Sequence, residues 1–315
     1  MSWFFKRVMV SLVMLWVIVT LVFMSIHFVP GDPVELLLSQ DGGSADPATV
    51  AMIREDLGLN RPVFEQYVEK IKGLAAFDLG RSMVDETSIS AEIARRLPRT
   101  LELIGMAALI SLAIGLPAGI FAALRNGGVF DRVASYIAGF AQGIPVFVLG
   151  TLMILVFSQM LKLTPAGGFV AFSQQPGRHM LLLLMPALSI GIGLAAIVFR
   201  ITRASTLEVL PLDYIRTARA KGLGKRRIVL HHILRNALIP VITIFALQIG
   251  TLLGGTVLVE YVFNWPGLSG MLVSGVNARD YPTVTGVILV ISALFIGLNL
   301  MVDILYGLTD PRIRK

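Results

Sequence analysis

The charged residues that could carry chemistry are concentrated in one segment, "DYIRTARAKGLGKRRIVLHHILRNALIP" at residues 213–240, which holds seven Lys or Arg, two His and one Asp. Within it, "GLGKRR" lacks the glycine spacing and the Ser or Thr after Lys that a phosphate-binding loop needs, so the chain is not expected to hydrolyse ATP. His231 and His232 are adjacent and would point about 100° apart on a helix, so they do not converge on a metal ion. The chain has no cysteine, which excludes a thiolate nucleophile and a cysteine metal site.

The segment contains the signals of a short helix over residues 214–221. Pro211 ends any helix that arrives from the preceding apolar run, and Asp213 is a favourable N-cap residue. Gly222 stands just after the helix, where a residue in the left-handed region is preferred. Gly224 then frees the chain to turn back toward the next apolar run.

Three uses of such a helix are open: a lipid-surface helix, a simple connector, or a contact for a soluble partner. Ala218 and Ala220 favour the partner, because small residues allow close docking. A lipid-surface helix needs bulky apolar residues, and only Tyr214 and Ile215 supply them. Nucleic-acid binding is disfavoured because the basic segment lies between apolar runs.

The elements that position this segment are membrane-spanning helices. The chain is 55% hydrophobic and 15% charged, whereas soluble domains carry about 25% charged residues. Six runs without Asp, Glu, Lys or Arg are long enough to cross a bilayer, and in lipid such runs must be helical. The first has 22 residues, longer than the apolar core of a signal peptide. An all-α membrane protein is therefore predicted, with six transmembrane helices at 8–29, 103–124, 133–161, 180–199, 236–259 and 283–302.

The distribution of basic residues predicts the orientation of these spans. Nine of the 27 Lys and Arg lie in the loop at 200–235, whereas the short loops on the opposite side hold only Lys162, Arg178 and Arg279. Because Lys and Arg favour the cytoplasmic side, we predict that this loop and both termini are cytoplasmic. The predicted parts are residues 1–29 with the first span, an outer segment at 30–99, and a core at 100–315 that includes a cytoplasmic loop at 203–235.

The outer segment carries helix signals rather than strand signals. Asp46 with Pro47 begins one predicted helix, which ends at Gly58. Pro62 begins a second, which ends near Gly73, and a third from Ser90 continues into the second span. A helical insertion of this size suits a docking surface or a pore cover, with a packing domain as the alternative.

Polar residues within the spans are candidates for a substrate pathway. Interhelical hydrogen bonding is the alternative use of such residues, and it is common in membrane proteins. Glu102 and Asp303 lie near span ends and are expected to serve orientation, capping or packing, and His27 is expected to pack. The segment after the fifth span is predicted to be a short interfacial helix anchored by Trp265. The candidate pathway residues are Gln142, Ser158, Gln159, Gln248, Thr251 and Asn299.

Several motifs resemble one family, the permease subunits of ATP-binding-cassette (ABC) importers for dipeptides and oligopeptides. The general coupling-loop pattern of such permeases is matched strictly only at Ala218, Gly222 and Leu234. The fuller match is to the peptide, glutathione and nickel branch, which has "DYxRTARAKGL" followed by "RNAxIP". Further matches are "PGDP" at 30–33, "DLGRS" at 78–82, "RLPRTLEL" at 96–103, "FNWPGL" at 263–268 and "RDYP" at 279–282.

This resemblance implies a type I ABC importer permease fold in the bacterial inner membrane. It also implies a second homologous permease, two ATPase subunits that carry ATP and Mg, and an extracytoplasmic solute-binding protein. The chain itself is expected to bind no cofactor and no metal. The implied ATPase contacts are Asp213, Tyr214, Arg216, Thr217, Ala218, Ala220, Lys221, Gly222 and Leu223.

The function that the resemblance implies is ATP-driven import of short peptides, with glutathione or nickel complexes as alternatives within the family. An ion-coupled secondary transporter is a second class. It is disfavoured because the spans lack Asp and Glu and no clear repeat is present. A membrane enzyme is a third class, and it would need a clustered nucleophile, base or metal set that four His and no Cys do not provide.

Overall fold

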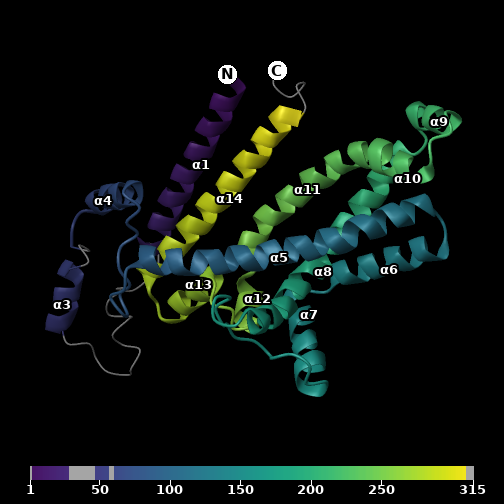
Figure 1. The fold of residues 1–315 in the computed structure, drawn as a ribbon. Coiled ribbons are helices and arrows are strands. Elements are labelled where there is room, and N and C mark those ends of the chain that lie inside the picture. Colours follow the sequence, from purple (N-terminus) through teal and green to yellow (C-terminus); the bar gives the residue numbers. More distant parts are fainter. Residues whose placement is uncertain (1, 28–46, 57–59, 310–315) are drawn as a thin grey trace. The chain divides into compact units, whose positions relative to one another are not determined.

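The chain is helical throughout the part that the computed structural model describes, residues 2–27, 47–56 and 60–309 (Figure 1). These residues contain no strand, only an isolated bridge between Arg81 and Ser88. Five helices are long and apolar enough to cross a membrane, or six if a bent pair counts as one span. The all-α prediction is therefore confirmed. The "PGDP" motif, Asp46 and Gly58 lie outside the described residues.

The chain divides into two compact units, residues 1–100 with 266–315 and residues 101–265. The first unit contains the predicted outer segment. The helix predicted from Pro62 is present, and it continues through Gly73 to Ala75. The described helices of this unit are α1 (Ser2–His27), α3 (Pro47–Asp56), α4 (Val63–Ala75), the start of α5 (Ile89–Leu124), α13 (Leu268–Asn277) and α14 (Tyr281–Thr309).

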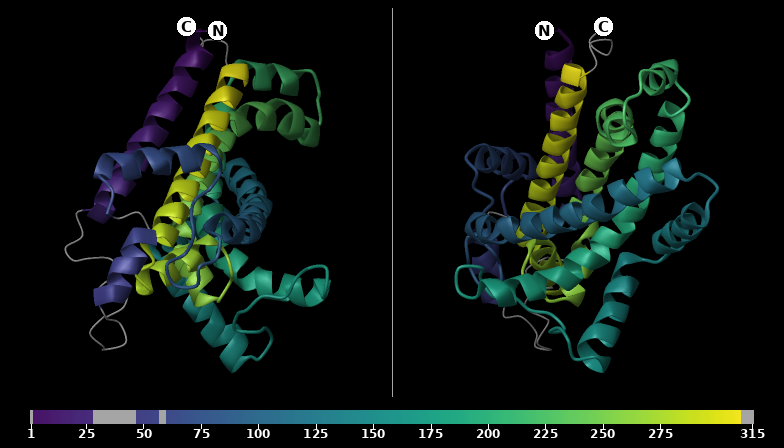
Figure 2. Two further views of the ribbon diagram at one scale, coloured as in Figure 1. Left: turned by 90° about the vertical axis from the view of Figure 1, so that its left-hand side faces the viewer. Right: turned by 45° about the vertical axis from the view of Figure 1, so that its right-hand side comes forward.

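Two contacts organise the first unit. Helices α1 and α14 run side by side (Figures 1 and 2), and an Arg7 Nη1 to Asp303 Oδ2 ion pair of 2.6 Å joins the beginning of α1 to the end of α14. A buried apolar cluster that includes Leu79, Ile89 and Leu268 packs the outer segment against α13 and α14. The predicted outer segment is thus held by residues from both ends of the chain.

The second unit continues α5 and adds the helices of the predicted core. It includes two π-helical turns, labelled η. Its other elements are α6 (Val129–Gly143), α7 (Val146–Met153), η2 (Ile154–Met160), α8 (Pro176–Val209), α9 (Asp213–Ala220), α10 (Lys225–Arg227), η3 (Ile228–Ile233), α11 (Leu234–Gly255) and α12 (Val257–Val262).

Helix α8 is the centre of the second unit. In its most apolar window 67% of the residues are buried, against 22% in the corresponding window of α11. Helices α6, α7 and α11 pack against it. It meets α5 at small residues. A Cβ atom on Gly115 would lie 2.8 Å from the Ala195 carbonyl oxygen, and one on Gly119 would lie 2.7 Å from Thr202 Cβ. Small residues four apart allow helices to approach closely in membranes.

The predicted span at 133–161 is not a single straight helix. It consists of α6 and of α7 with η2, bent by 101° at the break (Figure 2). Ile144 is extended, with φ −88° and ψ 123°, because the residue before a proline is pushed out of the helical region. Pro186 and Pro240 lie inside α8 and α11 without ending them. The break combines Gly143 with Pro145, whereas Pro186 lies between Met185 and Ala187, which favour helix.

Replacing Gly119 with Ala is expected to destabilise the protein, because the new methyl group would overlap Thr202 Cβ and the Phe199 carbonyl oxygen. Overpacking of this kind costs about 1–3 kcal/mol. Gly105→Ala, in the same helix, is the matched control because nothing lies within 4 Å of its Cβ position. The midpoint of thermal unfolding of the purified protein would fall for Gly119→Ala alone. Equal midpoints for the two variants would contradict the close contact of α5 with α8.

Candidate functional site

The short helix predicted over 214–221 is present as α9, and it begins one residue earlier than predicted. Leu212, with φ −67° and ψ 146°, occupies the N-cap position, and no side chain caps the helix. Asp213 is therefore the first helical residue and not the cap. Its carboxylate still lies where the helix dipole favours negative charge.

The C-terminal end of α9 is closed by a left-handed glycine, as predicted. Gly222 has φ +75° and donates its N–H to the Arg219 carbonyl oxygen at 3.0 Å. The Leu223 N–H donates to the Ala218 carbonyl oxygen at 3.3 Å, and the two bonds together form a Schellman motif. Gly224 has an ordinary φ of −62° and precedes α10. The chain turns back at Gly222, and no left-handed residue is needed at Gly224.

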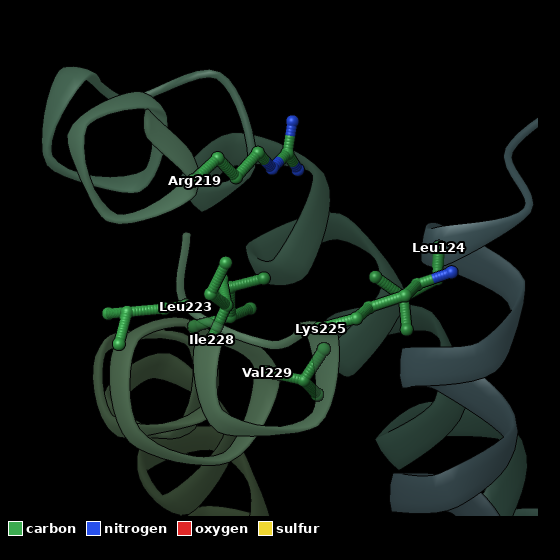
Figure 3. A pocket seen from close by; sticks show the side chains of 7 residues that line it. Leu124, Arg219, Leu223, Lys225, Ile228 and Val229 are labelled. Atoms are coloured by element: carbon green, nitrogen blue, oxygen red, sulfur yellow. The ribbon is translucent and has the colours of Figure 1, made fainter. Parts of the chain in front are cut away.

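The inner face of α9 is packed against its own chain. Ile215 is fully buried and Ala218 is 5% exposed, in a cluster with Ile228 and Ile233 of η3. Ala218 is therefore not an outward contact residue, contrary to the prediction. Its small side chain instead lets α9 lie close to η3. Leu223, half-buried, extends from the turn toward Ile228 (Figure 3).

Tyr214 connects the beginning of α9 to the beginning of α11 by a hydrogen bond with Asn236. Asn236 Nδ2 donates to Tyr214 Oη at 2.7 Å, and Tyr214 Oη donates to the His232 carbonyl oxygen at 3.4 Å. The "DYxRTARAKGL" stretch and the "RNAxIP" stretch are thus joined by a side-chain hydrogen bond. Tyr214, only 37% exposed, orients the beginning of α9 as well as contributing to its surface.

The outer face of α9 is exposed and basic. The Arg216 to Asp213 ion pair, at 3.5 Å, joins side chains that are 70% and 95% exposed, and such pairs contribute little to stability. Within the described chain, Arg219 and Lys221 have no acidic partner. The residues that form this face are Asp213, Arg216, Thr217, Arg219, Ala220, Lys221 and Gly222.

The candidate pathway residues are not brought together by hydrogen bonds in the described structure. Gln142 Oε1 accepts a bond of 2.6 Å from Arg200 Nη1. Thr251 Oγ1 donates to the Gln248 carbonyl oxygen and Asn299 Nδ2 to the Phe295 carbonyl oxygen, each bond within its own helix. The remaining two, Ser158 and Gln159, lie in η2. A role in the pathway stays a prediction for all six.

A polar pair that the sequence did not reveal joins a buried histidine at the start of α8 to a partly exposed glutamate. His179 is 1% exposed, its Nε2 lies 2.7 Å from Glu102 Oε1, and its Nδ1 donates to the Val170 carbonyl oxygen at 2.7 Å. The Val170 carbonyl oxygen accepts the Nδ1 proton. The contact between Nε2 and Glu102 Oε1 is a hydrogen bond only if one of these two atoms carries a proton. The sequence feature that could have indicated this pair is position, because Glu102 and His179 directly precede two predicted spans at their ends on the same side of the membrane.

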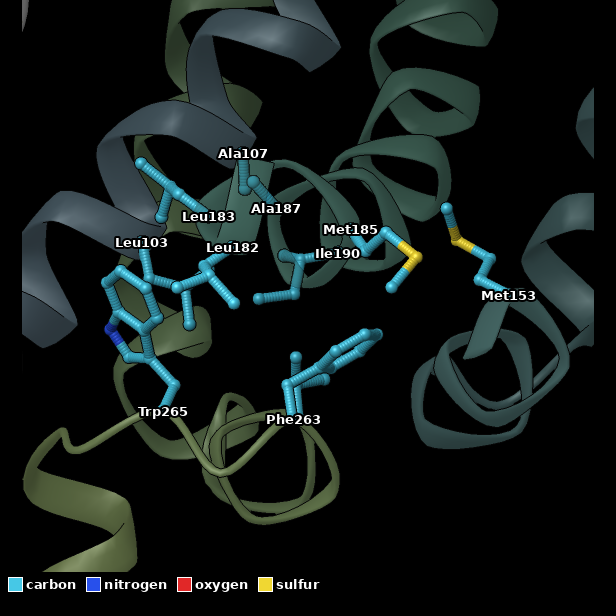
Figure 4. Close-up of a cluster of buried hydrophobic side chains, with 11 residues drawn as sticks. Leu103, Ala107, Met153, Leu182, Leu183, Met185, Ala187, Ile190, Phe263 and Trp265 are labelled. Atoms are coloured by element: carbon cyan, nitrogen blue, oxygen red, sulfur yellow. The ribbon is translucent and has the colours of Figure 1, made fainter. Parts of the chain in front are cut away.

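Trp265 belongs to this buried region and is not an interfacial anchor. It is 1% exposed, and its ring meets Phe169 and His179 edge-on at centroid distances of 5.1 and 5.8 Å. Figure 4 shows Trp265 turned toward Leu103, and Phe263 turned toward Met185 and Ile190. The indole is therefore used to hold the segment after α12 on the helices of the second unit.

The first unit contains a pocket of about 320 Å³ where "DLGRS" and "RDYP" meet. Asp280, 4% exposed, accepts bonds from the Met83 N–H at 3.1 Å and from Thr283 Oγ1 at 2.6 Å. Asp85 also lines the pocket, and a hydrogen bond from the Thr87 hydroxyl holds the pKa of Asp85 below its usual range. No group of three His, Cys, Asp or Glu that could hold a metal ion occurs in the residues described.

Comparison with protein families covers almost the whole chain. Residues 115–315 match the binding-protein-dependent transport system inner membrane component, and residues 1–104 match the N-terminal part of such a membrane component. The dipeptide transport system permease protein DppB of Escherichia coli (strain K12) is 38% identical over 320 residues, covering 94% of each chain. The glutathione transport system permease protein GsiC of the same strain is 40% identical over 314 residues, covering 100% of this chain and 99% of that protein.

A solved structure supports the fold. A chain of the MetNI methionine ABC transporter, in inward-facing conformations, aligns with a TM-score of 0.57 at 20% identity. The alignment covers 70% of this chain and 96% of that chain. At this identity the likeness concerns the fold alone, and it agrees with the predicted type I ABC importer permease fold.

Replacing Gly222 with Ala is expected to loosen the end of α9, because a side chain in the left-handed region costs about 1–2 kcal/mol. Local opening would become roughly 5–30 times more frequent, as measured by hydrogen exchange of the α9 amides in the assembled transporter. Gly224→Ala is the matched control, since Gly224 has an ordinary φ and open space around it. Equal exchange in both variants would contradict a structural role for the left-handed turn.

Proposed function

The chain belongs to the family of binding-protein-dependent transport system inner membrane components, and we propose that it forms the membrane path of an ATP-driven importer of short peptides. The observation that carries this proposal is the full-length match to two permeases, one for dipeptides and one for glutathione. Glutathione is itself a tripeptide, so the two cargoes share a short, charged peptide chemistry. The identities of 38% and 40% support this shared class rather than either cargo alone.

Alternatives outside this class have less support. Nickel complexes occur as cargo within the resembled branch, and no feature of the described residues favours them here. An ion-coupled transporter fits poorly with a family whose transport depends on a binding protein. ATP and Mg are assigned to partner chains.

We assign to α9 the contact with an ATPase subunit. Its exposed, basic outer face supports this role, and the buried residues Ile215 and Ala218 supply a rigid support beneath it. Of the contacts implied by the resemblance, we retain those that are exposed and treat Ala218 as a support residue. Leu223 and Tyr214 take both roles, because each is partly exposed and also packs or bonds to its own chain.

The proposed assembly contains a second, homologous permease, two ATPase subunits and a solute-binding protein on the outer side. The pocket at Asp280 supports a docking position for the binding protein, because it joins two motifs of the predicted outer surface. The subunit numbers follow from the family resemblance and are part of the proposal.

We propose that both termini are cytoplasmic and that the chain crosses the inner membrane six times. The Arg7–Asp303 ion pair supports this topology, because it joins the first turns of α1 to the last turns of α14. Termini on one side require an even number of crossings. The bent pair of α6 with α7 and η2 then counts as one span.

Site-specific crosslinking tests the contact of α9 with the ATPase, since the chain has no cysteine of its own. A photocrosslinker attached to Thr217→Cys, on the exposed face, is expected to capture an ATPase subunit in native membranes. Ser274→Cys, exposed on α13, is expected to capture none. Ala218→Cys is the adjacent buried control, which the reagent should label poorly.

Capture of the ATPase from Ser274→Cys as well as from Thr217→Cys would contradict the assignment to α9. So would the absence of capture from Thr217→Cys in membranes that contain the assembled ATPase. Neither outcome would affect the family membership, which rests on the sequence comparisons.

Uptake into proteoliposomes tests the cargo and the energy source. With the cognate binding protein present and ATP supplied to the nucleotide-binding side, labelled dipeptide or glutathione is expected to accumulate, and each is expected to compete with the other if the cargo class is shared. Omission of ATP or of the binding protein should abolish uptake. Uptake driven by a proton or sodium gradient without ATP would overturn the proposal.

A further inference from the structure

A pocket of about 340 Å³ in the second unit lies beside α9 and shares only Arg219 with its exposed outer face (Figure 3). Its wall is apolar and comes from three places: the last residue of α5, the turn after α9, and η3. These wall residues are Leu124, Leu223, Ile228, Val229 and Ile233.

Two cations complete the lining of the pocket, Arg219 at the end of α9 and Lys225 at the start of α10. In Figure 3, Arg219 lies above the apolar residues and Lys225 extends along them toward Leu124. No Asp or Glu lines the pocket, and neither cation has an ion-pair partner in the described part of the chain. The pocket therefore combines an apolar wall with an uncompensated positive charge.

The pocket lies where apolar helices meet a charged loop. Leu124 ends both α5 and the predicted span at 103–124 and is followed at once by Arg125, whereas Lys225 begins a basic stretch of the predicted cytoplasmic loop that precedes the apolar run at 236–259. Because Leu124 ends a predicted span, the pocket is predicted to lie at the boundary between the hydrocarbon core and the cytoplasmic headgroup region, where basic residues attract anionic lipid.

We propose that this pocket binds an anionic phospholipid. The phosphate lies between Arg219 and Lys225, and part of an acyl chain covers the apolar wall. A free phosphate ion would leave that wall exposed to water, and an uncharged lipid would leave both cations without a counter-charge. Because the wall joins α5, the turn after α9 and η3, the bound lipid connects α9 to the end of α5.

This proposal requires only that the chain is embedded in a membrane. It does not depend on the cargo. The pocket shares Arg219 and Leu223 with the proposed ATPase contact, but its test measures phospholipid retention and not ATPase capture, so the two proposals can fail separately. Failure of the uptake or crosslinking experiments would leave it unaffected.

Native mass spectrometry of the assembled transporter tests the site. The transporter would be placed in nanodiscs of phosphatidylglycerol mixed with phosphatidylcholine, and retained lipids would be counted after release. The double variant Arg219→Gln with Lys225→Gln is expected to bind phosphatidylglycerol roughly 25-fold more weakly, from the usual contribution of two basic residues near a membrane surface. Arg226→Gln with Arg227→Gln is the matched control, because it removes the same charge from exposed neighbours that do not line the pocket.

A second variant tests the apolar wall without changing the charge. Val229→Trp would fill the pocket from η3 and is expected to reduce phosphatidylglycerol retention while both cations remain. Hydrogen exchange of the α9 amides reports whether each variant keeps the local fold.

Three results would overturn the proposal. The first is an equal loss of phosphatidylglycerol in both double variants, which would indicate attraction by the whole basic loop. The second is equal retention of phosphatidylcholine and phosphatidylglycerol by the unmodified transporter. The third is capture of an ATPase segment, in place of lipid, by a photocrosslinker at Val229→Cys.

Discussion

The close contact of α5 with α8 is the constraint on which the second unit depends. Lipid surrounds apolar side chains as favourably as other helices do, so spanning helices associate through close packing rather than through the hydrophobic effect. Gly115 and Gly119 remove the side chains that would separate α5 from α8, and Gly191 does the same from α8. With α8 fixed in this way, α6, α7 and α11 pack around it.

The position of α9 follows directly from α8. Val209 ends α8 and belongs to the same buried cluster as Ile215 and Ala218 of α9 and Ile233 of η3. The Tyr214–Asn236 hydrogen bond adds a polar connection to α11. A force on the outer face of α9 would therefore reach α8 and α11 through packed side chains and a hydrogen bond, as the proposed coupling role requires.

Polar pairs fix several helix ends where apolar packing alone would leave rotation free. Arg203 Nη2 donates to buried Asp131 at 2.8 Å, which ties the first turn of α6 to α8. His179 with Glu102 makes a similar connection at the start of α8, between aromatic rings. In each pair the buried member, Asp131 or His179, is hydrogen-bonded to a partly exposed partner, and a buried polar group is tolerated away from water only when it is hydrogen-bonded.

The sequence was sufficient for those features that have a local cause. Runs of about 20 apolar residues must be helical in lipid, and Gly222 stands at a turn that requires a left-handed residue. Packing between distant segments decided the rest. Tertiary contacts placed Ala218 and Trp265 inside and brought His179 to Glu102. The break at Pro145 has a local component in Gly143, whereas α8 continues through Pro186, which is buried among neighbouring groups that allow the missing hydrogen bond to be tolerated.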